Sequence, residues 1–84
     1  MDSNKLLSVT VKGPNKQEFE GEAVSVTSLN KVGKFDVLPY HTNFISLIHE
    51  YVIIEQKDKK KITFPLETGI MKVFEDKVNI MIGV

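Results

Sequence analysis

The sequence predicts an all-β protein, a sandwich or a barrel formed by one domain over residues 1–84. Apolar and polar side chains alternate with a period of two along most of the chain, which is typical of strands that bury one face. Turn residues interrupt this alternation roughly every six to twelve residues, the spacing of small all-β domains. A chain of 84 residues is also too short to divide into two cores.

The first part of the chain predicts three short strands. Residues 7–11 alternate apolar and polar side chains, and the Gly-Pro-Asn triplet at residues 13–15 supplies a turn. Residues 17–20 read as a return strand anchored by Phe19, and residues 23–28 alternate again.

The middle of the chain predicts a loop followed by three strands. Residues 29–34 read as the loop, and the short strand that follows is stopped by Pro39, which cannot donate to a β-ladder. Residues 42–48 are rich in strand-forming residues. Residues 51–56 are apolar on both faces, which indicates a strand that is covered on both sides or lies near the middle of a sandwich.

The last part predicts two hairpins. The lysine-rich residues 57–61 form the tip of the first, and Pro65 indicates that the returning strand is an edge strand. Residues 68–69 (Thr-Gly) mark a bend or a bulge. The final hairpin joins residues 70–74 to residues 77–82 through a Glu-Asp turn.

Composition excludes several classes of protein. Eleven basic and eleven acidic side chains give a net charge of zero, so no overall field attracts nucleic acid or an anionic membrane. The absence of cysteine excludes disulfides and thiolate zinc sites. No apolar run approaches the roughly 20 residues of a membrane-spanning helix, and residues 1–5 lack the apolar core of a signal peptide. We therefore expect a soluble, intracellular protein.

The residues that carry chemistry do not form a recognisable catalytic pattern. A catalytic zinc needs about three converging ligands, and His41 and His49 offer two, with Asp36 or Glu50 as a possible third. The serines lie in no nucleophile elbow, and the acidic residues fall in turns or on polar strand faces. No glycine-rich loop precedes a helix. We expect no catalytic residue, no metal and no cofactor.

Two surface segments each admit two interpretations. The lysines of residues 57–61 form either a solvated hairpin tip, which we favour, or a contact for nucleic acid or lipid. The predicted loop 29–34 places Leu29 and Val32 among polar residues. These two side chains either fold back onto the sandwich or form a binding surface.

Several short motifs follow one another in a specific order. Residues 19–27 read FEGEAVSVT, residues 33–41 read GKFDVLPYH, and TGIMKV and DKVNIM begin at Thr68 and Asp76. Over nearly the whole chain, this order resembles the N-terminal β-sandwich domain of the epsilon subunit of F-type ATP synthases, which is called delta in mitochondria.

The resemblance implies a flattened antiparallel β-sandwich of about eight to ten short strands. The family's C-terminal helical hairpin is expected to be absent, since the sequence ends at Val84 directly after the last predicted strand. The resemblance also implies a non-catalytic rotor subunit at the foot of the central stalk, which binds the gamma subunit and the polar loops of the membrane c-ring. Such a subunit couples proton-driven rotation to ATP synthesis. It associates with the membrane only through the complex, on the cytoplasmic face in bacteria or the matrix or stromal side in organelles.

The resemblance assigns two interfaces by position. In the interface with the c-ring, Lys31 and Lys34 are expected to pair with acidic or polar side chains of the c-ring loops. The residues expected to face the c-ring are Leu29, Asn30, Lys31, Val32 and Lys34. The residues expected to face gamma are Tyr40, His41, Thr42 and Asn43.

Four positions depart from the family pattern. Asp36 and Tyr40 stand where the family has glycine, Thr68 replaces a further glycine, and Lys72 replaces an acid. Because a tyrosine disfavours positive φ, the turn at Tyr40 is expected to differ in type. These departures keep open a free-standing binding sandwich that serves another partner. A small hydrolase with an essential His41 is the third hypothesis.

Overall fold

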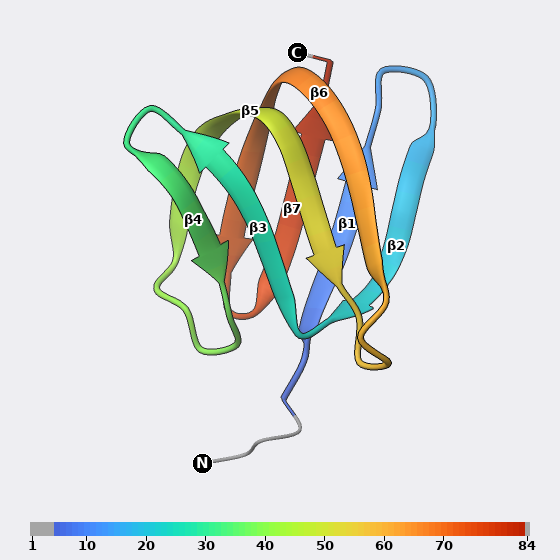
Figure 1. Ribbon diagram of the computed structural model, residues 1–84, viewed down its shortest axis with the longest axis vertical. Coiled ribbons are helices and arrows are strands. Elements are labelled where there is room, and N and C mark those ends of the chain that lie inside the picture. Colours follow the sequence, from blue (N-terminus) through green and yellow to red (C-terminus); the bar gives the residue numbers. More distant parts are fainter. Residues whose placement is uncertain (1–4, 84) are drawn as a thin grey trace.

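A computed structural model describes residues 5–83, and within this range the chain forms seven strands (Figure 1). The expectations for the first residues and for Val84 concern positions outside this range. The strands are β1 (Leu7–Lys12), β2 (Gln17–Ala23), β3 (Ser25–Asn30), β4 (Gly33–Val37), β5 (Phe44–Glu55), β6 (Lys61–Phe74) and β7 (Lys77–Ile82).

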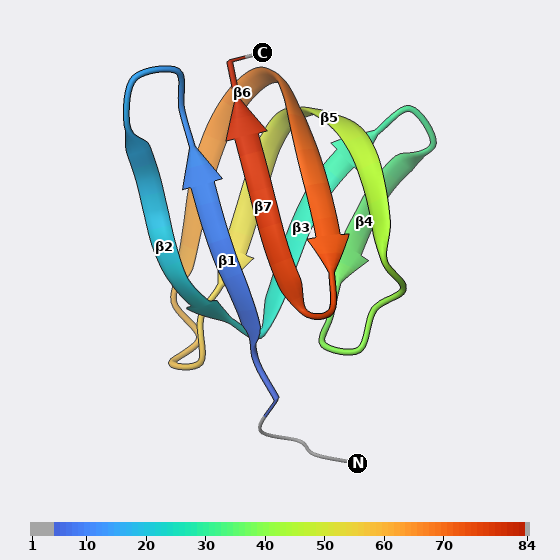
Figure 2. The same ribbon diagram turned by 180° about the vertical axis from the view of Figure 1, so that it is seen from behind.

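The strands form one sheet in the order β2-β1-β7-β6-β5-β3-β4, which folds over itself into two layers (Figures 1 and 2). The principal extents of 36 × 26 × 19 Å agree with the predicted flattened sandwich. The sheet is not antiparallel throughout, because β1 and β7 pair in parallel. No hairpin joins these two strands, whereas strands joined by a short turn must run in opposite directions.

The prediction of about eight to ten strands was wrong because two pairs of predicted strands are continuous. Residues 42–48 and 51–56 contribute to β5, and residues 62–66 and 70–74 both belong to β6. The β5–β6 register shifts between His49 and Glu50. The shift acts as a β-bulge, which bends a strand without ending it. Both strands therefore arch over the top of the molecule and contribute one half to each layer (Figure 1).

The core lies between the two layers and is built by the predicted alternation. On β1, for example, Leu7, Val9 and Val11 are buried while the intervening side chains point outward. The one buried polar residue among residues 5–83 is Ser28, whose Oγ donates a hydrogen bond to the carbonyl oxygen of Tyr51 at 2.7 Å. The buried apolar residues are Leu7, Val9, Val11, Ala23, Val26, Val37, Ile48, Val52, Ile54, Met71, Val73, Val78 and Ile80.

Aromatic pairs close the two open sides of the folded sheet. Phe19 of β2 contacts Phe64 of β6, with ring centroids 6.3 Å apart, and Phe35 of β4 contacts Phe44 of β5 at 5.8 Å. Each pair joins a terminal strand of the sheet to the opposite layer, in the edge-to-face geometry that aromatic rings prefer.

The predictions for the strand environments hold in two cases. The half of β6 that contains Pro65 pairs with β5 alone, so it is an edge, as the proline indicated. Strand β5 lies between β6 and β3, which agrees with the predicted position of residues 51–56 near the middle of the sandwich. Among residues 5–83, no helix has the length and apolar character needed to cross a membrane.

Candidate functional site

The segment predicted to face the c-ring is a tight β-hairpin rather than a six-residue loop. Strand β3 continues to Asn30 and β4 begins at Gly33, so Lys31 and Val32 alone form the turn. The Asn30 side chain fixes this turn, because its Oδ1 accepts hydrogen bonds from the N–H groups of Val32 at 2.9 Å and Gly33 at 3.2 Å. Its amide also donates to Ser46 Oγ at 3.2 Å, which attaches the hairpin to β5.

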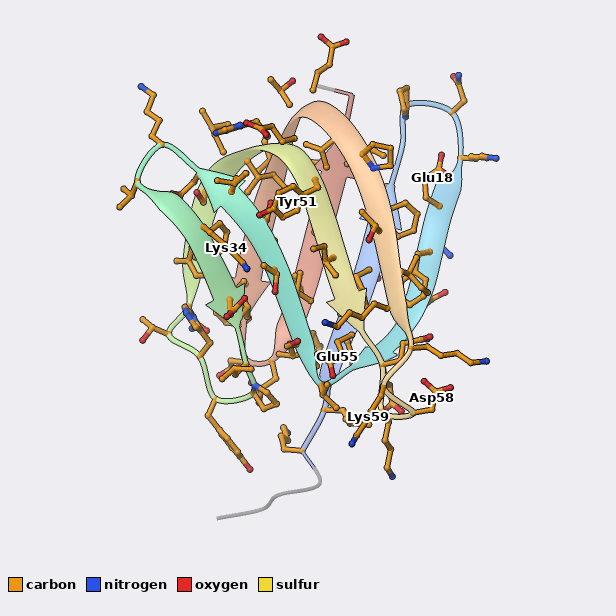
Figure 3. The ribbon with its side chains drawn as sticks, viewed as in Figure 1. Glu18, Lys34, Tyr51, Glu55, Asp58 and Lys59 are labelled. Carbon is orange, nitrogen blue, oxygen red and sulfur yellow. The ribbon has the colours of Figure 1, made fainter. Side chains whose placement is uncertain are left out.

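The structure separates the two apolar residues of this segment. Val32 is 96% exposed at the tip of the hairpin, whereas Leu29 is half-buried on β3. Lys31 and Lys34 are exposed, and neither takes part in an ion pair among residues 5–83. Figure 3 labels Lys34 on β4. The hairpin tip therefore presents one apolar side chain beside two cations that are free to pair.

The segment predicted to face gamma lies in the connection between β4 and β5. Tyr40 is 60% exposed and has a φ of 69°, so this tyrosine adopts the left-handed conformation that its side chain disfavours. Its N–H donates a hydrogen bond of 2.6 Å to Oδ1 of Asp76, in the turn between β6 and β7. The same turn is attached a second time, because Asn43 Oδ1 accepts a hydrogen bond from the N–H of Glu75 at 2.8 Å.

His41 has local structural partners. Its Nδ1 donates to the carbonyl oxygen of Thr42 at 2.7 Å, and its ring lies 5.0 Å from the ring of Phe44. His41 precedes β5 whereas His49 lies within it, and His49 Nδ1 lies 3.3 Å from Oε2 of Glu50. Among residues 5–83, no group of three His, Cys, Asp or Glu side chains is placed to hold a metal ion.

The hairpin tip and the Tyr40 connection lie near opposite ends of β4, and the first half of β5 runs between them (Figure 1). A hollow of about 320 Å³ is lined by Lys31 and Val32 of the hairpin and by Ile45 and Leu47 of β5. A second hollow of about 640 Å³ is lined by Asn43, by Ile45 and by residues of β6 and β7. The two predicted interfaces are therefore joined into one surface.

The sequence interpretation missed the centre of this surface. Ile45 is 69% exposed and Leu47 is 71% exposed, although both lie on a strand whose alternate residues reach the core. The signal was present in residues 42–48, where apolar residues occupy both faces and only one face is needed for the core. We call the following set the outer face: Ile45, Leu47, Ile70, Lys72, Phe74, Asn79 and Met81.

The outer face belongs to the layer seen from the front in Figure 2. Its exposed large apolar residues are contiguous, because β5 pairs with β6 and β6 pairs with β7 in register. A contiguous patch of exposed apolar residues on a small protein often marks an interaction surface. The arrangement is thus suited to binding a protein.

The chain matches known proteins over nearly its whole length. Residues 6–83 match the family model for the β-sandwich domain of the ATP synthase delta/epsilon chain. The ATP synthase epsilon chain of Sulfurimonas denitrificans is 35% identical over 77 residues, which cover 90% of this chain and 59% of that protein. The epsilon chain of Nitratiruptor sp. is 36% identical over 83 residues, which cover 98% of this chain and 62% of the relative.

Solved structures share the fold. A chain in the cryo-EM structure of the Euglena gracilis mitochondrial ATP synthase matches 92% of this chain with a TM-score of 0.85 and 16% identity, over 50% of its own length. A chain in the central stalk and c-ring structure of the Tetrahymena thermophila enzyme matches 93% with a TM-score of 0.76 and 12% identity, over 63% of its length. The family model matches most of the chain, so the protein belongs to the ATP synthase delta/epsilon chain family, within its β-sandwich domain.

Proposed function

We propose that this protein is a non-catalytic central-stalk subunit of an F-type ATP synthase. It binds the gamma subunit and the c-ring and couples proton-driven rotation to ATP synthesis. It reaches the membrane only through these partners, on the cytoplasmic face in a bacterium or on the matrix or stromal side in an organelle. The chain spans about 60% of the length of the epsilon chains it matches, with 59% and 62% covered in the two relatives above.

The continuity of the surface from Val32 to Asn43 carries this proposal. A coupling subunit must hold two partners at once, and the β3–β4 hairpin and the Tyr40 connection lie near opposite ends of one strand. The exposed Ile45 and Leu47 fill the space between them. In our proposal the hairpin, with Lys31 and Lys34, faces the c-ring, and residues 40–43 together with the outer face bind gamma.

The test is capture of the gamma subunit of the same host by the wild-type chain and two variants. Leu47→Glu places a charge among the exposed apolar residues of the outer face, and Thr63→Glu places one at an exposed position on the opposite layer. We expect wild type and Thr63→Glu to bind at micromolar concentration or tighter. Leu47→Glu should weaken binding by at least about tenfold, as for a residue in the centre of an interface.

Two results would contradict the proposal. Failure of the folded wild-type chain to bind gamma would favour a free-standing binding module. Equal loss of binding in both variants would show that charge anywhere on the sandwich disturbs binding, so the outer face would not be the docking surface. Circular dichroism of each variant establishes that it is folded.

A further inference from the structure

Lys72 occupies the centre of the outer face. On β6 its neighbours on the same face are Ile70 and Phe74, two residues away on each side. Across the strands it lies opposite Ile45 of β5 and Asn79 of β7. Its side chain therefore emerges between apolar groups and one amide.

None of the surrounding positions supplies a carboxylate. The adjacent rows of the face contain Leu47 and Met81 on one side and Lys77 on the other. The ion pairs among residues 5–83 join Lys5 to Asp76 and Lys60 to Asp58, and His49 would pair with Glu50 only as an imidazolium, so Lys72 takes part in none. Its exposed ammonium group is therefore solvated rather than paired with a carboxylate of residues 5–83.

A partner that covers this face must replace that water. An ammonium group that loses its hydration without gaining an opposite charge lowers the affinity of the complex. An ammonium group that pairs with a carboxylate of the partner contributes to binding specificity. Two hollows border Lys72, one of about 640 Å³ toward β5 and one of about 170 Å³ toward β1 and β7. They leave room for a partner side chain beside the ammonium group.

We propose that the surface docking on the outer face is an apolar patch that carries a carboxylate, and that this carboxylate pairs with Lys72. The inference rests on the proposed function, since the partner is the protein that binds the outer face. Lys72 then determines specificity, because it rejects apolar surfaces that lack an acidic group at this point.

A second copy of this chain does not fit the same role. In a two-fold symmetric contact the outer face would meet itself. With the two-fold axis near the centre of the face, Lys72 of one copy would lie against Lys72 of the other, and no residue of the outer face is a carboxylate that could separate them. Like charges facing each other across an interface suppress association.

The experiment compares Lys72→Met and Lys72→Glu with Lys61→Met and Lys61→Glu in the full chain. Lys61 is an exposed lysine on the same strand, in the half that belongs to the other layer. Dissociation constants for the gamma subunit are measured between about 0.05 and 0.5 M NaCl, since salt screens ion pairs. Carbodiimide, which joins a lysine amine to a carboxylate in an ion pair, is applied to the wild-type complex, and the product is mapped by mass spectrometry.

We expect Lys72→Met to bind about tenfold more weakly at low salt, Lys72→Glu more weakly still, and both Lys61 variants as wild type does. Salt should weaken wild type more than Lys72→Met, and the cross-link should join Lys72 to the partner. If wild type binds gamma but Lys72→Met binds equally well without a cross-link at Lys72, this proposal is overturned and the proposed function stands. If wild type does not bind gamma, both fail. A wild-type dimer that protects Lys72 also overturns the proposal.

Discussion

At the scale of single residues, Tyr40 shows how the connection between β4 and β5 is held. Its φ of 69° is a left-handed conformation that a tyrosine adopts only when its surroundings enforce it. Pro39 restricts the chain before it, and the carboxylate of Asp76 accepts its N–H at 2.6 Å. Asp76 is itself placed by the tight turn between β6 and β7, where its φ is 66°. The side chain of Tyr40 is thus presented outward at a local conformational cost.

Replacing Tyr40 by glycine should therefore raise stability while it weakens binding. Relief of the left-handed strain exceeds the entropy cost of glycine, so we expect about 0.5–1 kcal/mol of added stability. Because a partly exposed tyrosine is a frequent binding residue, affinity for gamma should fall. Denaturant unfolding and the dissociation constant measure the two effects. Tyr40→Phe, which keeps strain and ring, is the control, and a less stable Tyr40→Gly would contradict the argument.

Asp76→Ala should destabilise the protein by about 1–3 kcal/mol, because the Tyr40 N–H loses its acceptor and alanine disfavours positive φ. Asp76→Asn keeps an acceptor oxygen and tolerates this conformation, so it should lose less than half as much. Asp58→Ala removes a comparable contact to the N–H of Lys60 at an exposed hairpin tip and should change stability by less than about 0.5 kcal/mol. Equal effects at both aspartates in urea unfolding would exclude a special role for Asp76.

At the scale of the elements, the bends in β5 and β6 decide the architecture. Each strand crosses from one layer to the other beside the register shift at His49 and Glu50, where Glu50 has a φ of 73°. Gly69 follows the bend in β6 and is packed tightly. A Cβ at this position would lie 2.8 Å from the backbone carbonyl oxygen of Met81 on β7.

Gly69→Ala should consequently destabilise the fold by about 1–3 kcal/mol, because backbone atoms of β7 would have to move. Gly13→Ala is the matched control. The added Cβ there meets only the flexible end of the Glu18 side chain, at 2.9 Å, so stability should change by less than about 0.5 kcal/mol. The free energies of unfolding of the two variants are measured by thermal or urea unfolding. An unchanged stability of Gly69→Ala would contradict the prediction, because it would mean that β6 and β7 separate without cost.

At the scale of the whole molecule, the lysines of the β3–β4 hairpin and those of the β5–β6 tip lie at opposite ends. Lys31 and Lys34 belong to the β3–β4 hairpin, whereas Lys57 and Lys59 belong to the β5–β6 tip (Figures 1 and 3). At the β5–β6 tip, the N–H of Gln56 donates to the carbonyl oxygen of Lys60, and the N–H of Lys59 donates to that of Gln56. In the proposed function, a contact between the β3–β4 hairpin and the c-ring leaves the β5–β6 tip away from the ring.

Charge reversal should therefore act at one end only. Lys31→Glu and Lys34→Glu should leave stability within about 0.5 kcal/mol, because exposed charges contribute little, and should weaken co-purification with the c-ring. Lys57→Glu and Lys59→Glu form the control pair and should assemble as wild type does. Loss of assembly in the second pair instead would assign the ring contact, or a lipid contact, to the β5–β6 tip.

The sequence by itself determined the fold class and most of the strands. Alternation such as that of Leu7, Val9 and Val11 is a local pattern that fixes which face of the strand is buried. The turns at residues 13–15 and 75–76 likewise depend on local backbone preferences. The family followed from short motifs in order. These features are readable because each depends on residues close together in the chain.

The tertiary structure alone decided the rest. Whether residues 42–48 and 51–56 are two strands or one bent strand depends on the pairing partner β6. Tyr40 takes a left-handed conformation because Asp76, 36 residues away in the chain, accepts its N–H. The outer face likewise gathers residues of three strands, and Ile45 is exposed only because no element covers it among residues 5–83. Contacts between distant segments are set by the folded arrangement, which no local pattern contains.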